Sequence, residues 1–296
     1  MKKIVLSLLL LTLLTSNSGS IPNPAPPPQT AIIAGWNILG FDPIPDERVK
    51  RIAKTIRKIN PDLIVLTEVN PNDVPQKIVQ ELGADYQAPI ILPQNAGVIQ
   101  NIALIFKTGV SVSDAKLLPD TDLPEEAGSR QALAANVRIG NFDFVLVGVH
   151  LKSGRASSSR AKRTRQCTAI AEFMTSAVAG NEKDVLVIGD YNMVPRTGAT
   201  RNDEANFFAL SPTNFLRFVS SDFLAGKASH IDGCSPLRGN LLDGFAISRT
   251  FTTEFIAGST RLISFSKLGT TCAAFKQNVS DHLPLVSEFR IGTDDD

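Results

Sequence analysis

The chain has 296 residues, of which 43% are hydrophobic and 20% are charged, and its formal net charge is +1. This length leaves ample chain to bury the core of one large domain. The near-neutral charge excludes a global basic field that would steer the whole protein to nucleic acid.

Residues 1–20 have the pattern of a secretory signal peptide. Lys2 and Lys3 precede an apolar run at residues 4–14, and small residues follow as far as Ser20. The run is well short of the roughly 20 residues that span a bilayer, and no other stretch of the sequence is long or apolar enough. We expect cleavage after Ser20 and a secreted or periplasmic protein without a membrane span. Uncleaved anchoring is the competing interpretation.

The composition changes again after the predicted signal peptide. Residues 21–30 are rich in proline, which predicts a short extended linker. Residues 31–292 contain no further low-complexity break and no internal repeat, so we expect one catalytic domain, followed by an acidic tail at 293–296. We expect a monomer without a stable protein partner.

Short apolar runs rich in β-branched residues predict strands along the domain. They cover residues 31–36, 63–67, 102–106, 142–149, 185–188, 242–247 and 285–291. Amphipathic segments predict helices at residues 46–59, with Asp46 as the N-cap, and at about 160–179. This mixture indicates an α/β or α+β protein, although spacing alone does not choose the topology.

Polar side chains with catalytic potential gather at the ends of these strands. The set is Asn37, Glu68, His150, Asp190, Asn192, Asp243, Asp281 and His282. Taken singly, an Asp or Asn at a strand end is more often a turn or cap residue. However, loops at strand ends are where rigid scaffolds hold catalytic groups, and two of the three histidines belong to the set.

Six ordered motifs carry a resemblance to a known family. They are Gly35-Trp36-Asn37, Leu66-Thr67-Glu68-Val69, Gly148-Val149-His150-Leu151-Lys152-Ser153, Gly189-Asp190-Tyr191-Asn192, Leu242-Asp243-Gly244-Phe245 and Ser280-Asp281-His282-Leu283-Pro284. From residue 31 to about 290 the chain resembles the endonuclease/exonuclease/phosphatase family. The resemblance implies a four-layer αββα sandwich, with two facing β-sheets between helices and an active site at one rim.

The same resemblance implies a divalent metal and a phosphodiester substrate. Glu68, with Asn37 and Asp281, would supply the oxygen ligands that hard ions prefer. Mg²⁺ is the expected ion, with Mn²⁺ or Ca²⁺ as alternatives. Hydrolysis of an anionic phosphodiester needs charge neutralisation, an activated water and a proton for the leaving oxygen.

The remaining motif residues supply the acid–base chemistry in this interpretation. His282 is the expected general base, and Asp243 would hold its ring and tautomer. His150 would protonate the leaving group or donate a hydrogen bond to the phosphate. Asp190 and Asn192, two positions apart on one turn, would orient the water or a phosphate oxygen.

His150 also bears on the subclass, because the abasic-site endonuclease branch usually has another residue type there. The chain is more similar to DNase I-like nucleases, sphingomyelinases and phosphoinositide phosphatases. Gln100 stands near where secreted DNase I proteins place a carboxylate partner for this histidine. His230, the third histidine, we expect to shape the rim structurally.

A basic run follows His150. Residues 152–165 contain no acidic residue and the basic residues Lys152, Arg155, Arg160, Lys162, Arg163 and Arg165. We interpret Lys152, Arg155, Arg160 and Arg163 as contacts to substrate phosphates, which favours a nucleic acid substrate. The alternative is a solvated helix face. The run has no interleaved aromatics, so it does not indicate a base-stacking platform.

Two other functions compete with a nuclease acting on DNA or RNA. A phosphatase or phospholipase C-type enzyme of the same fold would share the reaction core. A sphingomyelinase would need exposed apolar loops, for which the candidates are Phe207, Phe208, Phe215, Phe218 and Phe223. A non-catalytic exported binding module is the third possibility, and the complete set of motif residues argues against it.

Three cysteines remain to be explained. Cys167 falls on the predicted core face of the helix at about 160–179, so Cys234 and Cys272 are by elimination the candidate disulfide pair. Three reduced, buried thiols are the alternative.

Overall fold

The computed structural model describes residues 29–40, 44–92, 94, 100–123, 125, 129–179, 182–193, 216–224, 226–248 and 252–292. The predicted signal peptide, nearly all of the proline-rich linker and the acidic tail lie outside these residues, as do Phe207, Phe208, Phe215 and the side chain of Phe223. Within the described part, no helix has the length and apolar character needed to cross a membrane.

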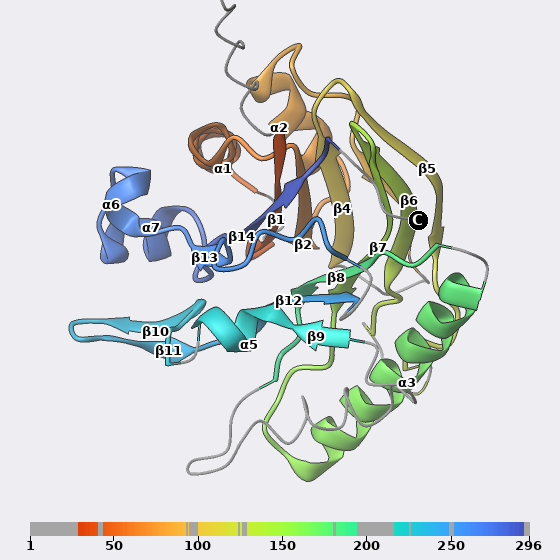
Figure 1. The fold of residues 1–296 in the computed structure, drawn as a ribbon. Helices are drawn as coiled ribbons and strands as arrows, with labels where there is room; N and C mark the ends of the chain where they lie inside the picture. The colour runs from red at the N-terminus through yellow and green to blue at the C-terminus, as the bar shows by residue number, and fades with distance from the viewer. Residues whose placement is uncertain are drawn as a thin grey trace, which may run out of the picture.

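Two six-stranded sheets form the centre of the molecule (Figure 1). The first sheet has the order β13 (Arg261–Leu262), β14 (Leu285–Arg290), β1 (Thr30–Asn37), β2 (Leu63–Val69), β4 (Asn101–Phe106) and β3 (Ile90–Ile91). The second has the order β5 (Val110–Leu117), β6 (Leu133–Ile139), β7 (Phe142–His150), β8 (Val185–Asp190), β12 (Asp243–Ser248) and β9 (Leu216–Phe218). Within each sheet one central pair, β1 with β2 and β7 with β8, is parallel.

Helices cover the outer faces of the two sheets. The first sheet carries α1 (Asp46–Ile59), α2 (Val74–Leu82), α6 (Phe265–Leu268) and α7 (Cys272–Asn278), and the second carries α3 (Ser157–Ala179). The short helix α5 (Val219–Leu224) precedes a separate hairpin of β10 (His230–Cys234) and β11 (Leu237–Asn240). The arrangement confirms the predicted αββα sandwich.

The apolar runs of the central strands have a direct structural reason, since both of their faces are buried. In β2, Leu63 and Val65 face the core between the sheets, whereas Ile64 and Leu66 pack under α1 and α2. Strands covered on both sides read as nearly continuous apolar segments. The sheets approach closely at Gly35, where an added Cβ would stand 2.6 Å from Cγ2 of Ile188.

The predicted elements agree with the structure apart from their ends. The helix at 46–59 has the predicted bounds, but its N-cap is Pro45 and no side chain caps it, so the prediction for Asp46 is wrong. The second helix begins at Ser157, three residues earlier than expected. Five of the seven predicted strands extend by one or two residues and include polar residues that the sequence placed just beyond them.

The cysteine prediction is confirmed. A disulfide joins Cys234 in the β10–β11 hairpin to Cys272 at the start of α7, with a Cα–Cα distance of 5.7 Å. Cys167 lies on the buried face of α3 and is not part of a disulfide. In the chain-entropy view, closing this loop of 38 residues stabilises the fold by about 3–4 kcal/mol. The bridge also ties the hairpin to the helix that precedes His282.

Candidate active site

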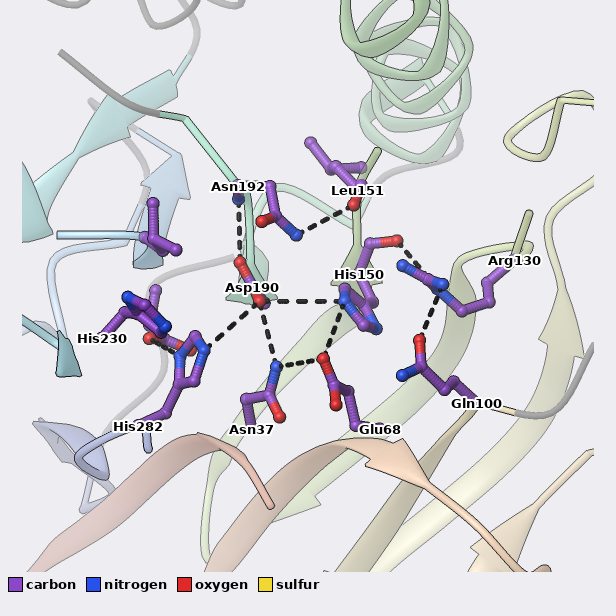
Figure 2. Close-up of polar contacts among 12 residues, drawn as sticks. Asn37, Glu68, Gln100, Arg130, His150, Leu151, Asp190, Asn192, His230 and His282 are labelled. Atoms are coloured by element: carbon purple, nitrogen blue, oxygen red, sulfur yellow. Dashed lines mark hydrogen bonds and ion pairs between the residues drawn. The ribbon is translucent and has the colours of Figure 1, made fainter. Parts of the chain in front are cut away.

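The candidate site lies where the central strands of both sheets end (Figure 2). The parallel strands β7 and β8 end side by side, so His150 pairs with Asp190. The antiparallel strand β12 begins at the same edge, which pairs Asp243 with Asp190. Asn37 ends β1 in the facing sheet and reaches Asp190 through a side-chain hydrogen bond. Topology therefore brings these residues together at one rim.

Glu68 occupies a bulge in β2 rather than following the strand. The register with β4 shifts between Leu66 and Val69, and Glu68 has a φ of 56°. Bulges re-aim side chains, and a left-handed non-glycine residue costs of order 1–3 kcal/mol. Gly40 leaves room for this bend, because a Cβ there would stand 2.3 Å from the Glu68 carbonyl oxygen. The bulge and the left-handed backbone of Glu68 turn its carboxylate into the site.

Asn37 joins the two sheets across the site. Its Nδ2 donates to Oε1 of Glu68 and to Oδ2 of Asp190, each at 3.0 Å. Its Oδ1 accepts from the backbone N–H of Leu39 at 2.9 Å, which determines the orientation of the amide. The predicted role of Asn37 as an oxygen ligand therefore differs from the structure, in which it positions two carboxylates.

Glu68 and Asp190 nevertheless suit a hard divalent cation. Nε2 of His150 lies 3.7 Å from a carboxylate oxygen of each, and the three ligand atoms lie within 4.8 Å of one another. Burial and the nearby Asp243 raise the pKa of Asp190 to about 6. A cation would offset this unfavourable accumulation of buried negative charge. The donor set fits the divalent ion on which the family depends.

His282 and Asp243 form the predicted dyad. Nδ1 of His282 lies 2.7 Å from Oδ2 of Asp243. The backbone carbonyl of His282 accepts a hydrogen bond from Nε1 of Trp36. The backbone N–H of His282 donates to Oγ of Ser280, so both sides of this peptide unit are held. Burial alone would lower the pKa of His282, but the carboxylates of Asp243, Asp190 and Asp281 raise it to about 10. Nε2 remains directed into the site, 4.0 Å from Oδ2 of Asp190.

His150 has a different environment in the same site. Burial lowers its pKa well below the usual value, and the positive charges of Arg130 and His282 lower it further. Burial outweighs the two carboxylates at 3.7 Å, so the ring is neutral near pH 7. Its Nδ1 has no hydrogen-bond partner among the described residues. Gln100 bonds to Arg130, whose Nη1 donates to its Oε1 at 2.9 Å.

Asn192 completes the turn after β8. Its backbone N–H donates to Oδ1 of Asp190 at 2.8 Å, and its Nδ2 donates to the carbonyl of Leu151 at 3.1 Å. The residue has a φ of 52°, which asparagine tolerates better than most residues. Tyr191 between them is buried and packs edge-on against Phe218. Asn192 thus orients Asp190, while Tyr191 serves packing. The predicted role of Asn192 in orienting water or a phosphate oxygen stays a prediction.

Asp281 lies close to two histidines. Among the described residues, the acidic and histidine groups that converge within 4.8 Å place it with His230 and His282, and not with Glu68. Its Oδ2 lies 3.6 Å from Nε2 of His230. Its predicted role beside Glu68 at the same ion therefore stays a prediction.

The sequence of this domain also matches a known family. The model of the endonuclease/exonuclease/phosphatase family matches residues 34–282. The chain belongs to this family. Its members include nucleases and phosphatases, so phosphoesterase chemistry is the expected setting for the dyad and the carboxylates. No curated protein matches the sequence significantly.

Solved structures of family members share the fold at low sequence identity. The human nocturnin catalytic domain with bound sulfate has 18% identity and a TM-score of 0.65, over 88% of this chain and 94% of nocturnin. TDP2 from D. rerio, complexed with a single-strand DNA product, has 16% identity and a TM-score of 0.64, over 88% of this chain and 99% of TDP2. NExo, a 3′ phosphatase from Neisseria bound to a product DNA hairpin, has 16% identity and a TM-score of 0.62, over 88% of this chain and 99% of NExo.

The basic run at residues 152–165 contains both a buried residue that holds a loop and residues that an anion can reach. Arg163 is 1% exposed, and its Nη1 donates to the carbonyls of Lys152 and Gly154 at 2.6 and 2.9 Å. The prediction that Arg163 binds substrate phosphate is therefore wrong, because it holds the loop after β7. Arg155 is exposed, and Arg160, which donates to the Arg155 carbonyl, is partly exposed. These residues and Lys152 remain accessible to an anion.

Sequence reasoning missed Arg130 and the location of His230. Arg130 precedes β6 as a single arginine without a motif, and nothing in the sequence marks it. His230 was predicted to be structural, but its ring centroid lies 4.9 Å from that of His282. The signal that could have located it was its place at the start of a short strand ahead of the Asp243 motif.

Proposed function

We propose that this protein is an exported, divalent-metal-dependent phosphodiesterase, and specifically a nuclease that hydrolyses DNA or RNA. The observation that carries the proposal is the His282–Asp243 dyad, which directs a free Nε2 toward the Glu68–Asp190 carboxylates. A base beside a site for a hard cation is what water attack on a phosphodiester requires.

Each residue has a part in the proposed reaction. The unprotonated form of His282, which the charge of a bound divalent ion would favour, takes a proton from the attacking water through Nε2, and Asp243 stabilises the imidazolium that forms. His150, being neutral, donates a hydrogen bond to a phosphate oxygen from its ring N–H. A divalent ion at Glu68 and Asp190 supplies charge neutralisation when bound. Asn37 and Asn192 hold these carboxylates through the contacts described above.

Two observations support a nucleic acid substrate. TDP2 and NExo, which share this fold, were solved with DNA products. Lys152 and Arg155 lie in the loop after His150, and Arg160 lies in the first turn of α3, where positive charge opposes the helix dipole. A local cost of this kind beside a catalytic residue favours a role in binding backbone phosphate.

One feature of the sequence and one of the structure support export of the protein. The first 20 residues have signal-peptide character, and the fold carries the Cys234–Cys272 disulfide. Disulfides persist in oxidising compartments and are rare in the cytosol. Mass spectrometry of the protein secreted by a heterologous host tests this proposal. A mature N-terminus at Ile21 is the expected result, and retention of Met1 in the cytosol would contradict it.

A substrate panel tests the activity. The mature protein is incubated with plasmid DNA, RNA, a 3′-phosphorylated oligonucleotide, sphingomyelin and inositol phosphates, each with Mg²⁺, Mn²⁺, Ca²⁺ or chelator. We expect nucleic acid cleavage that Glu68→Gln and chelator abolish. Selective turnover of a lipid or metabolite would replace the nuclease by the phospholipase or phosphatase alternative. Absence of turnover with every substrate and ion would favour the binding module.

Salt dependence tests the role of the basic run. Arg155→Gln with Arg160→Gln should reduce the slope of log affinity for duplex DNA against log salt by about 0.9 for each lost phosphate contact. Hydrolysis of bis(p-nitrophenyl) phosphate should survive, because these contacts are remote from the scissile bond. The matched control is Arg51→Gln with Lys54→Gln, two exposed residues on α1. An unchanged slope in the first pair would identify the run as a solvated face.

A further inference from the structure

Two histidine–carboxylate pairs converge on Asp281. In the first, Nδ1 of His282 is held by Asp243 at 2.7 Å. In the second, Nδ1 of His230 lies 3.3 Å from Oδ1 of Asp232, at ion-pair distance although without hydrogen-bond geometry. In the His230 ring, Nε2 is the nitrogen that faces Asp281. In the His282 ring, Asp243 occupies Nδ1, so Nε2 is the nitrogen left for an ion. A backbone β-bridge pairs His230 with His282, and this pairing brings the two rings close together.

The free atoms of this cluster are close enough to share one ion. Nε2 of His230 lies 3.6 Å from Oδ2 of Asp281. One ligand atom each from His230, Asp281 and His282 lie within 4.8 Å of one another. Ligands about 2.0–2.1 Å from a tetrahedral ion stand about 3.4 Å apart, so only small side-chain movements are needed. Oδ1 of Asp281 has no hydrogen-bond partner among the described residues.

We propose that His230, Asp281 and His282 form a second cation site, which takes Zn²⁺ or a similar transition ion and blocks the reaction when it is filled. The binding part stands on geometry alone. The inhibitory part rests on the proposed function, because it assumes that His282 is the general base.

The donor set distinguishes this site from the Glu68–Asp190 site. Imidazole nitrogen suits Zn²⁺ and other late transition ions, whereas Mg²⁺ prefers oxygen ligands in octahedral geometry. Two histidines and one carboxylate leave a fourth tetrahedral position open. Metal-bound histidines usually have a carboxylate or carbonyl on their other nitrogen, and Asp243 and Asp232 already stand at those positions.

Access and charge also favour an ion here. The side chains of His230 and Asp281 are 24% and 22% exposed, so the cluster opens to solvent on one side. Asp190, Asp232 and Asp243 surround the two rings, and a divalent cation would offset their charge. These distances make the cluster a site for a cation rather than an anion.

Inhibition follows from the chemistry of His282. Its Nε2 holds one lone pair, because Nδ1 carries the proton that faces Asp243 in the neutral base. A bound Zn²⁺ uses that lone pair, and the ring can no longer accept a proton from water. Filling the second site should therefore stop catalysis while the Glu68–Asp190 site still holds Mg²⁺.

Cobalt binding tests the site without reference to activity. The mature protein, saturated with Mg²⁺, is titrated with Co²⁺ while the visible absorption of tetrahedral Co²⁺ is recorded. We expect one equivalent to bind, to be displaced by Zn²⁺, and to be lost in His230→Gln. Glu68→Gln should bind Co²⁺ normally. Loss of the signal in Glu68→Gln with retention in His230→Gln would overturn the proposal, because the ion would then lie at the other site.

A milder variant guards against misfolding of His230→Gln. Asp232→Asn changes only an exposed partner of the ring and should weaken Co²⁺ binding by about 10-fold, as is usual for the carboxylate behind a metal-bound histidine. Unchanged affinity in a folded Asp232→Asn protein, together with unchanged affinity in His230→Gln, would reject the site.

Inhibition is the second measurement. Zn²⁺ should inhibit Mg²⁺-dependent hydrolysis of the best substrate in the panel, and His230→Gln should raise the inhibitory concentration by at least about 10-fold. Zinc binding without inhibition would keep the site but contradict the assignment of His282 as base. Inhibition that is equally strong in His230→Gln would contradict the site itself.

Discussion

His282 and His150 are both buried at one rim, yet their pKa values shift in opposite directions. Three carboxylates raise the pKa of His282 to about 10 against the effect of burial. Burial, Arg130 and the charge of His282 lower the pKa of His150 well below its usual value. Desolvation disfavours the charged form of any histidine, so the neighbouring charges decide which ring carries a proton.

The contrast assigns different roles to the two rings. His282 has a carboxylate that can stabilise an imidazolium, which suits a group that gains a proton during the reaction. His150 has a cation beside it and an unpaired Nδ1, which suits a ring that stays neutral and donates a hydrogen bond. Of its two predicted roles, donation to the phosphate is therefore favoured over protonation of the leaving group.

The largest expected effect is the loss of the dyad. His282→Gln and Asp243→Asn should each lower kcat by about 10³–10⁴-fold, because one removes the base and the other its tautomer control. The double variant should lose little more than the worse single one, since the two residues act as a unit. Single-turnover rates on the best substrate provide the measurement. Additive losses would show that the residues act independently.

A smaller loss is expected at the other ring. His150→Gln should lower kcat by about 10²–10³-fold, the usual cost of one transition-state hydrogen-bond donor. The pH dependence of kcat/KM should keep its midpoints, because a ring that stays neutral does not titrate in the working range. A shift of the alkaline midpoint in His150→Gln would instead identify His150 as the proton donor and break the contrast.

Stability against pH provides the third test, in chelator so that no ion binds the site. The folded pKa of His282 lies above its unfolded value of about 6.5. Its contribution is therefore fully present below pH 6.5 and is lost as pH rises through about 10. Urea midpoints should fall over this range in the wild type and fall less steeply in Asp243→Asn. A flat wild-type profile would contradict the raised pKa.

The smallest expected effect concerns Arg130. Because its charge helps to hold the pKa of His150 down, Arg130→Met should raise that pKa, but burial should keep the ring mostly neutral at pH 7. Imidazole NMR signals of the metal-free protein report both histidines in one titration. The control is Arg138→Met on β6, an exposed residue. An equal shift in both variants would mean that long-range charge, rather than Arg130, controls the ring.

The sequence alone determined the outline of the fold and the membership of the site. Apolar runs report the central strands because both faces of these strands are buried. The motif order placed Glu68, His150, Asp190, Asp243 and His282 at strand ends, and the structure brings all of them to one rim. The disulfide partner of Cys234 also followed from the helical position of Cys167.

Only the tertiary structure decided what each side chain does. Arg163 looked like its basic neighbours in sequence, but the return of the loop after β7 buries it. The amide of Asn37 turns its nitrogen to Asp190, a residue 153 positions away, because the two sheets pack face to face. Local periodicity carries no information about such distant pairings. Hydrogen-bond direction and pKa depend on the few ångströms around each group, which only the packed sheets and loops define.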